Sequence, residues 1–201
     1  MISVYNIKPW FQSVLNPILV FLHKKSVTAN QITITAFWFS LVIGVLFWNA
    51  DTVHYLFLIL PVGLLIRMAL NALDGMMARR YNQVSKKGEV YNELGDVVSD
   101  LFVFFPLIKH EPEAIYAVVL FIVMSSVNEF AGVLGKLVAG ERRYEGPMGK
   151  SDRAFILGLY GLVCYLSLDI SQYSNYIFYA LCGLVVLSTI LRVTKTLKKI
   201  G

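Results

Sequence analysis

The sequence predicts an all-α membrane protein with six transmembrane helices and an additional N-terminal interfacial helix. Of its 201 residues, 57% are hydrophobic and only 15% are charged, and the mean hydropathy is +0.63. A water-soluble domain of this size carries more charge and fewer apolar residues. The apolar residues also form long runs, as membrane-spanning helices require. We therefore expect one membrane domain over residues 1–201 and no soluble second domain.

The N-terminal segment, residues 1–28, is expected to lie on the membrane surface. It mixes aromatic residues such as Trp10 and Phe11 with prolines, and it ends near the Lys24-Lys25 pair. This mixture is typical of interfacial helices. The segment has no short apolar core followed by a small-residue cleavage site, so it is not predicted to be a signal peptide.

Residues 29–201 are predicted to form the six-helix bundle. The first span follows a group of cap-forming residues around Thr28, whose side chains can accept hydrogen bonds from the first free N–H groups of a helix. A basic, glycine-containing loop at residues 140–153 separates the fourth span from the fifth. The expected spans are residues 32–48, 55–73, 92–108, 114–138, 154–168 and 175–191.

The positive charges predict the orientation of the bundle. Of the 18 lysines and arginines, only Lys109 falls on the side opposite to the termini in this layout. Because Lys and Arg are enriched in cytoplasmic loops, both termini and the basic loop are expected to be cytoplasmic. The same positive rim would attract anionic lipid headgroups and nucleotide phosphates. The formal net charge of +5 therefore requires no nucleic acid partner.

Polar residues at helical spacing mark the end of the second span and the start of the third. Asn71 and Asp74 are three residues apart, and Asn92 and Asp96 are four apart, so each pair shares one face of a helix. The short loop between the two helices makes them antiparallel neighbours whose polar faces can converge at the cytoplasmic boundary. Oxygen ligands without nearby Cys or His favour one or two Mg²⁺ or Mn²⁺ ions. The alternative is a pair of helix ends with ordinary polar caps.

Small residues beside this group leave space for a nucleotide. Gly75, Ala78 and Gly88 would let the backbone approach a flat base and phosphates closely. Arg79 could neutralise phosphate charge. Together with Asp74, these are the candidate nucleotide-binding residues.

The pattern from Asn71 to Asp96 resembles the signature of the CDP-alcohol phosphatidyltransferase family. In that signature, D-x-x-D-G-x-x-A-R is followed, after eight residues, by G-x-x-x-D-x-x-x-D. The segment Thr28-Ala-Asn-Gln-Ile-Thr33 is also similar to the T-P-N-x-I-T found before the first span in many members. The resemblance covers the six-span layout as well, and it implies a homodimer.

The resemblance implies that Asn71, Asp74, Asn92 and Asp96 hold metal ions that bridge a CDP diphosphate, and that Asp96 is the base for the acceptor hydroxyl. This chain has asparagine at the first and third of the four positions. Asparagine keeps a carbonyl oxygen ligand but removes a negative charge at each place. Two divalent ions would bring four positive charges to two carboxylates, so affinity for a second ion is expected to fall.

The implied reaction is phospholipid synthesis: a phosphatidyl group passes from CDP-diacylglycerol to a small polar alcohol, and CMP is released. The basic loop favours a phosphorylated acceptor. Lys150 and Arg153 are the nearest matches to residues that hold the acceptor phosphate in some family members, and Arg142 and Arg143 are further candidates. Those two arginines could instead serve topology and anionic-lipid binding.

Three ionisable residues inside the spans are expected to be structural or to support the site, because buried intramembrane charges need partners. Asp100 is expected to pair with Arg67 or a loop cation, and Glu129 to face the bundle cavity or pair with Arg67.

The sequence is also compatible with functions other than transfer from CDP-diacylglycerol. One is a catalytically degenerate member that binds CDP-lipid or a partner without turnover. Another uses CDP-choline or CDP-ethanolamine as the donor and diacylglycerol as the acceptor. A small transporter would need inverted halves or broken mid-membrane helices, which the sequence lacks. The expected location is the inner membrane of a bacterium.

Overall fold

The computed structural model describes residues 8–201, in which all regular secondary structure is helical. Residues 1–7, part of the predicted interfacial segment, lie outside the described residues. The elements are α1 (Lys8–Lys24), α2 (Ala29–Trp48), η2 (His54–Leu58), α3 (Ile59–Arg80), α4 (Lys86–Phe104), α5 (Leu107–His110), η3 (Pro112–Ala114), α6 (Ile115–Ala139), α7 (Lys150–Tyr165) and α8 (Ser171–Ile200).

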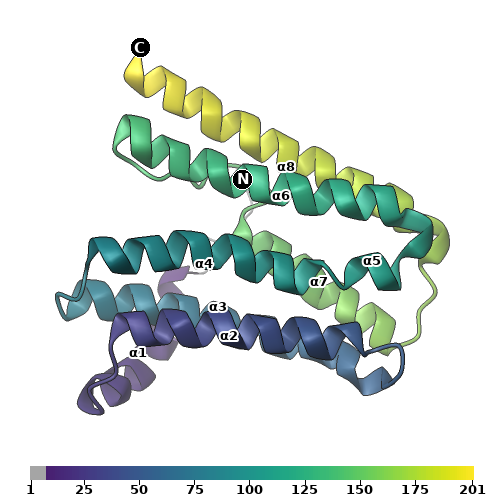
Figure 1. Cartoon of the computed structure of the whole chain (residues 1–201), viewed down its shortest axis with the longest axis horizontal. Coiled ribbons are helices and arrows are strands. Elements are labelled where there is room, and N and C mark those ends of the chain that lie inside the picture. The colour runs from purple at the N-terminus through teal and green to yellow at the C-terminus, as the bar shows by residue number, and fades with distance from the viewer. Residues whose placement is uncertain (1–7) are drawn as a thin grey trace.

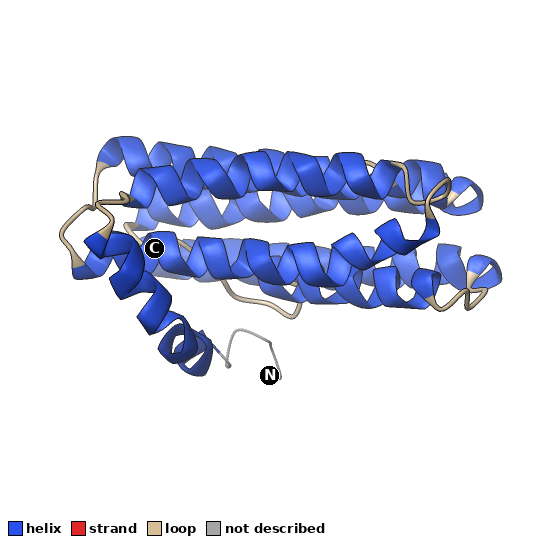
Figure 2. Ribbon diagram, turned by 90° about the horizontal axis from the view of Figure 1, so that it is seen from below, coloured by secondary structure: helices blue, strands red, loops and turns tan. Residues whose placement is uncertain are grey.

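The long helices run side by side in one elongated bundle, with α1 inclined to it at one end (Figures 1 and 2). Two groups are visible in Figure 1, one formed by α2, α3 and α4 and the other by α6 and α8. Helix α7 packs against α3. Helix α2 packs against both α3 and α4, whereas α3 and α4 make no extensive contact with each other. The second and third expected spans therefore pack mainly through α2, and they meet directly at a hydrogen bond between Asn92 and Asp74.

Four helical segments are long and apolar enough to cross a membrane: Ala29–Trp48, His54–Arg80, Pro112–Ala139 and Ser171–Ile200. Many large apolar side chains on them, such as Trp38 and Leu65, are exposed on the outside of the bundle. Such a surface suits lipid rather than water. The chain is thus an all-α polytopic membrane protein. Helices α4 and α7 are not among these four, because α4 carries charged residues along most of its length and α7 has only 16 residues.

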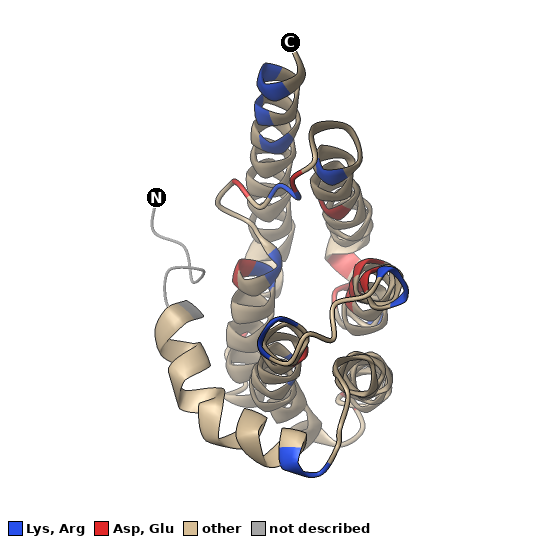
Figure 3. Cartoon of the chain, turned by 90° about the vertical axis from the view of Figure 1, so that its left-hand side faces the viewer, with Lys and Arg blue, Asp and Glu red and all other residues tan. Residues whose placement is uncertain are grey.

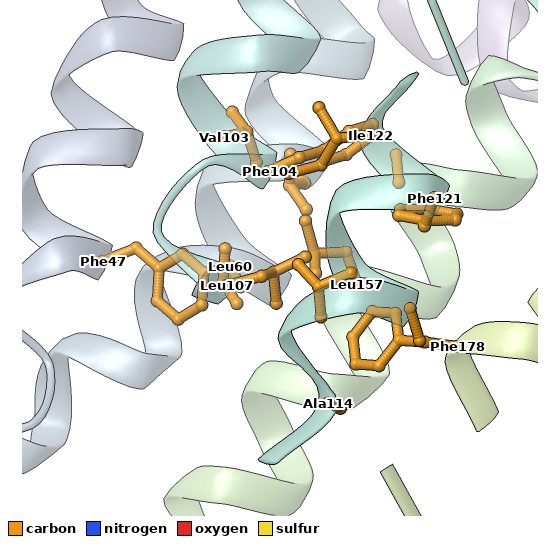
Figure 4. Close-up of a cluster of buried hydrophobic side chains, with 14 of the residues drawn as sticks. Phe47, Leu60, Val103, Phe104, Leu107, Ala114, Phe121, Ile122, Leu157 and Phe178 are labelled. Carbon is orange, nitrogen blue, oxygen red and sulfur yellow. The ribbon is translucent and has the colours of Figure 1, made fainter. Parts of the chain in front are cut away.

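The main hydrophobic core joins all the long helices except α1. Figure 4 shows Phe47, Leu60, Phe104, Phe121 and other side chains from α2, α3, α4 and α6 packed together. A second cluster docks α1 on the bundle, and it includes Leu15, Leu19, Ala29, Ile32, Leu73 and Met77.

Glycine permits the close approach of α2 and α4. A Cβ atom on Gly44 would lie 2.2 Å from the carbonyl oxygen of Phe102. The two backbones are therefore in contact, and only glycine fits between them without displacement. This contact fixes the register of α4, the helix that carries half of the candidate site, against α2.

Candidate active site

Asp74 is at the centre of the polar group that the sequence singles out. Its Oδ2 atom accepts a hydrogen bond from Thr33 Oγ1 at 2.9 Å and from Asn92 Nδ2 at 3.5 Å. The residue is only 4% exposed. The structure therefore brings the polar faces of α3 and α4 together, and it adds a third contributor, Thr33 on α2.

Local hydrogen bonds hold the first turns of α2 and α4 in place. Thr28 and Gln31 form a capping box at the start of α2. The backbone N–H of Ala29 donates to Gln83 Oε1 at 2.7 Å, which ties α2 to the loop between α3 and α4. At the start of α4, Ser85 Oγ accepts from the N–H of Gly88 at 3.1 Å. The bond between Ala29 and Gln83 thus keeps the cap-rich stretch before the first span next to the site.

Asp96, the predicted base, is one helical turn beyond Asn92. Its Oδ1 atom is in direct contact with Lys150 Nζ at the start of α7. The side chains of Lys150 and Asp96 are 25% and 15% exposed, so the pair is reachable from outside. Both charges also act on the Asp74 carboxylate. The structure thus places a residue expected to bind the acceptor beside the residue expected to be the base.

The donor set fits a hard divalent cation. Asp74 has no ion-pair partner among residues 9–201, and its two side-chain hydrogen-bond donors are neutral. A buried carboxylate without a counter-charge is costly, and a bound cation would relieve that cost. Asn71, one turn earlier on α3, is partly buried. Within the described part of the chain, no three His, Cys, Asp or Glu residues converge in a metal-binding group, so any cation here depends on amide oxygens as well.

The predicted nucleotide-binding residues surround the ends of α3 and α4. A Cβ atom on Gly75 would lie 3.1 Å from a guanidinium nitrogen of Arg79, so that side chain lies across the glycine. A Cβ atom on Gly88 would lie 2.5 Å from Asn30 Oδ1, so the start of α4 is pressed against α2. Arg79 itself is exposed, and Ala78 is partly buried. A larger residue at Gly75 would therefore displace the Arg79 side chain, and one at Gly88 would displace Asn30.

A buried ion-pair network lies deeper in the bundle. Asp100 binds Arg67 at 2.7 Å, which is one of the two pairings expected for it, and Arg153 at 2.8 Å. Arg153 also binds Glu129 at 2.8 Å, and its side chain is fully buried. The pairing of Glu129 with Arg67, one of the two arrangements expected, is not formed, because Arg67 is held by Asp100. Glu129 binds Arg153 and, at 3.0 Å, Arg142.

The two arginines of the basic loop are also paired. Arg142 lies 2.8 Å from Glu93, next to the candidate ligand Asn92. Burial alone would lower the pKa of Arg142, but the Glu129 and Glu93 carboxylates raise it. Arg143 lies 3.7 Å from Glu141 and Glu145. Each of the four predicted acceptor-binding cations therefore has at least one carboxylate partner.

Two residues belong to this region that sequence reasoning did not assign to it. From the sequence, Thr33 is expected only as part of the entry to the first span, and its place one turn into α2 is the signal that could have found it. Arg192 lies just beyond the last expected span, residues 175–191. It is 1% exposed, donates to the carbonyl of Asn128 at 2.6 Å and lies 3.8 Å from Glu129. Figure 3, which views the bundle from the end near the C-terminus, shows acidic and basic positions gathered at this end.

Comparison with known proteins identifies the family. The model of the CDP-alcohol phosphatidyltransferase family matches residues 26–193. The chain belongs to the CDP-alcohol phosphatidyltransferase family. The resemblance seen in the motif from Asn71 to Asp96 is thus confirmed at the level of the family.

Similar proteins include one from Escherichia coli and one from Mycobacterium tuberculosis. The inner membrane protein YnbA of E. coli strain K12 is 44% identical over 173 residues, which cover 86% of each chain. The crystal structure of M. tuberculosis phosphatidylinositol phosphate synthase with CDP-DAG bound has a TM-score of 0.75 at 20% identity, covering 94% of this chain and 96% of that one. The same enzyme with manganese and citrate gives a TM-score of 0.73 at 21% identity, covering 92% and 90%. At these identities, the likeness to the synthase concerns the fold.

Proposed function

We propose that this CDP-alcohol phosphatidyltransferase family member transfers a phosphatidyl group from CDP-diacylglycerol to a small polar alcohol and releases CMP. The observation that carries the proposal is the buried Asp74 carboxylate, which lacks an ion-pair partner among residues 9–201 and lies beside Asn92, one turn from Asp96. The similar fold of a synthase with bound CDP-DAG supports the choice of donor.

Asn71, Asp74, Asn92 and Asp96 would hold Mg²⁺ or Mn²⁺ in this proposal. A bound ion would neutralise the charge of the diphosphate. The oxygen-only donor set supports a hard cation, and a structure of similar fold contains manganese. Gly75, Ala78, Gly88 and Arg79 would border the nucleotide.

The role of Asp96 is to accept the proton of the acceptor hydroxyl. The acceptor oxygen then bonds to the phosphorus that carries the lipid, and the bond from that phosphorus to the oxygen of CMP breaks. An ionised carboxylate is a weak base for an alcohol, so Asp96 must act mainly through position. The contact with Lys150 supplies such positioning, because it holds one carboxylate oxygen and leaves the other available.

A phosphorylated alcohol is the acceptor that the basic residues favour. Lys150, Arg142, Arg143 and Arg153 would surround its phosphate. All four are paired with carboxylates, but a guanidinium has five N–H donors and can bind a carboxylate and a phosphate together. Lys150, Arg142 and Arg143 are the partly exposed members that a phosphate would reach first, whereas the Arg153 side chain is fully buried.

The proposed setting is the inner membrane of a bacterium, in agreement with the name of the E. coli relative. Six spans would comprise the four long apolar helices together with α4 and α7, as one membrane domain. The basic end of the bundle, with the active site and both termini, would face the cytoplasm. A homodimer completes the proposal on the strength of the family resemblance.

A second candidate function is binding of CDP-lipid or a partner without turnover. The observation that favours it is the asparagine at two of the four ligand positions, Asn71 and Asn92. It would leave the fold and the donor site intact and remove the chemistry.

Release of CMP by purified protein in lipid separates the two candidates. The assay contains CDP-diacylglycerol, Mg²⁺ or Mn²⁺, and a panel of alcohols with and without phosphate: glycerol 3-phosphate, inositol phosphates, inositol and serine. Acceptor-dependent CMP release that is lost in Asp96→Asn would support the transferase. The matched control is Asp169→Asn, in the loop between α7 and α8. No release with any acceptor or metal, despite measurable binding of CDP-diacylglycerol, would favour the binding protein.

A further inference from the structure

Two ion pairs join α7 to α4 at successive turns of the helices. Lys150 binds Asp96, and three residues later Arg153 binds Asp100, which is four residues beyond Asp96. The second ion pair, between Arg153 and Asp100, is buried, and Arg153 also forms an ion pair with Glu129. It therefore fixes the register of the two helices, and this register presents the Lys150 ammonium to Asp96.

The first ion pair places the positive charge of Lys150 beside Asp96, a carboxylate of the candidate metal site. Asp74 and Asp96 contribute a charge of −2 and Lys150 contributes +1, so the group carries −1 before any ligand binds. One divalent ion changes this sum to +1, and a second ion would change it to +3. Because Coulomb repulsion grows with each added charge, the residues present suit one divalent ion and disfavour a second.

The two asparagines act in the same direction. Asn71 and Asn92 offer carbonyl oxygens but no charge, so they can complete the shell of an ion at Asp74 without attracting another ion. Asn92 already contacts Asp74 through its amide nitrogen Nδ2, so its carbonyl oxygen would face an ion at Asp74 after rotation of the amide, and the contact of Asp96 is with Lys150. The two carboxylates are therefore in different local environments, one facing neutral groups and one facing a cation.

We propose that this site binds a single divalent cation at Asp74, and that the Lys150 ammonium supplies the second positive charge of the site at Asp96. This inference rests on the proposed function in that it concerns the same site. In this role Lys150 is a positioning residue, which orients Asp96.

The test is a count of bound Mn²⁺ by electron paramagnetic resonance on the full chain in lipid nanodiscs, with and without CDP-diacylglycerol. The variants are Lys150→Met, the double variant Asn71→Asp with Asn92→Asp, and the triple variant that combines them. Lys198→Met, at the exposed end of α8, is the matched control for loss of one lysine. Gel filtration and thermal unfolding establish that each variant is folded before ions are counted.

We expect one Mn²⁺ per chain in the unaltered protein and in the control, and two per chain in the triple variant. Lys150→Met alone is expected to tighten Mn²⁺ binding several-fold, because the repelling ammonium is removed. Two ions or none in the unaltered protein, or an unchanged affinity in Lys150→Met, would overturn the proposal. The count is independent of CMP release: a protein that binds one ion but releases no CMP refutes the transferase and leaves the single-ion site intact.

Discussion

Thr33 donates a 2.9 Å hydrogen bond to the buried carboxylate of Asp74 and thereby joins α2 to the centre of the candidate site. Hydrogen bonds to charged groups contribute about 1.5–3 kcal/mol. Replacement by valine keeps the shape of the side chain but removes the donor. We therefore expect Thr33→Val to lower kcat/KM for CDP-diacylglycerol by roughly tenfold or more.

Thr35→Val is the control, because Thr35 is exposed on the same helix and, within the described part of the chain, bonds only to the backbone carbonyl of Gln31. Kinetics of CMP release with varied CDP-diacylglycerol measure the effect. Equal kinetics in the two variants would show that Asp74 keeps its position without Thr33.

Removal of the charge of Arg153 should destabilise the bundle. Arg153→Met would leave Asp100 and Glu129 with fewer counter-charges in a buried environment. Losing one partner of a buried ion pair costs about 3–5 kcal/mol. Thermal unfolding in detergent should therefore show a large fall in the midpoint.

A charge-preserving substitution offers a check on the cause. Arg153→Lys keeps a counter-charge for Asp100 and Glu129, so it should lose less stability than Arg153→Met. If the two variants are equally destabilised, the contribution of Arg153 comes from packing and guanidinium geometry rather than charge.

A methyl group at Gly44 should separate α2 from α4. The added Cβ atom of Gly44→Ala would lie 2.2 Å from the Phe102 carbonyl oxygen, which belongs to the backbone and cannot rotate away. Overpacking of this kind costs about 1–3 kcal/mol. Gly183→Ala, where the added Cβ has nothing within 4 Å, is the matched control. The midpoints of thermal unfolding compare the two, and equal midpoints would mean that α4 shifts at no cost.

Chelation of divalent ions should stop the proposed reaction reversibly. With EDTA present, CMP release is expected to fall to background, and added Mg²⁺ or Mn²⁺ should restore it, because the oxygen ligands of the site suit these ions. Binding of CDP-diacylglycerol provides the parallel readout. Full CMP release in EDTA would refute the metal requirement.

Hydropathy located the helices well but not their ends. All six expected spans overlap helices of the structure. Helix α4 begins at Lys86 rather than near residue 92, because Ser85 caps a polar first turn that hydropathy does not register. It ends at Phe104 because Pro106 follows closely. Helix α8 continues to Ile200 because Arg192 and Thr196 are buried along its basic end.

The spacing of the motif predicts which residues share the site, but it does not predict all of their ion-pair and hydrogen-bond partners. The motif placed Asp74 near Asn92 because both belong to one pattern. The choice of Arg153 rather than Arg67 for Glu129 depends on how α7 lies against α4 and α6, which no local pattern encodes. Thr33 was missed for the same reason, since its partner Asp74 is 41 residues away.

Glu129 is the common counter-ion of three cations from separate segments: Arg142 in the loop after α6, Arg153 on α7 and Arg192 on α8. A neutral residue at any one of these positions changes the charge balance felt by the others. Natural substitutions here should therefore be correlated, with relatives that lack the acid at position 129 also losing a base at 142, 153 or 192. Substitutions of Glu129 and its three arginines would then occur together during evolution. One carboxylate would thereby limit which substitutions three distant segments of the chain can accept.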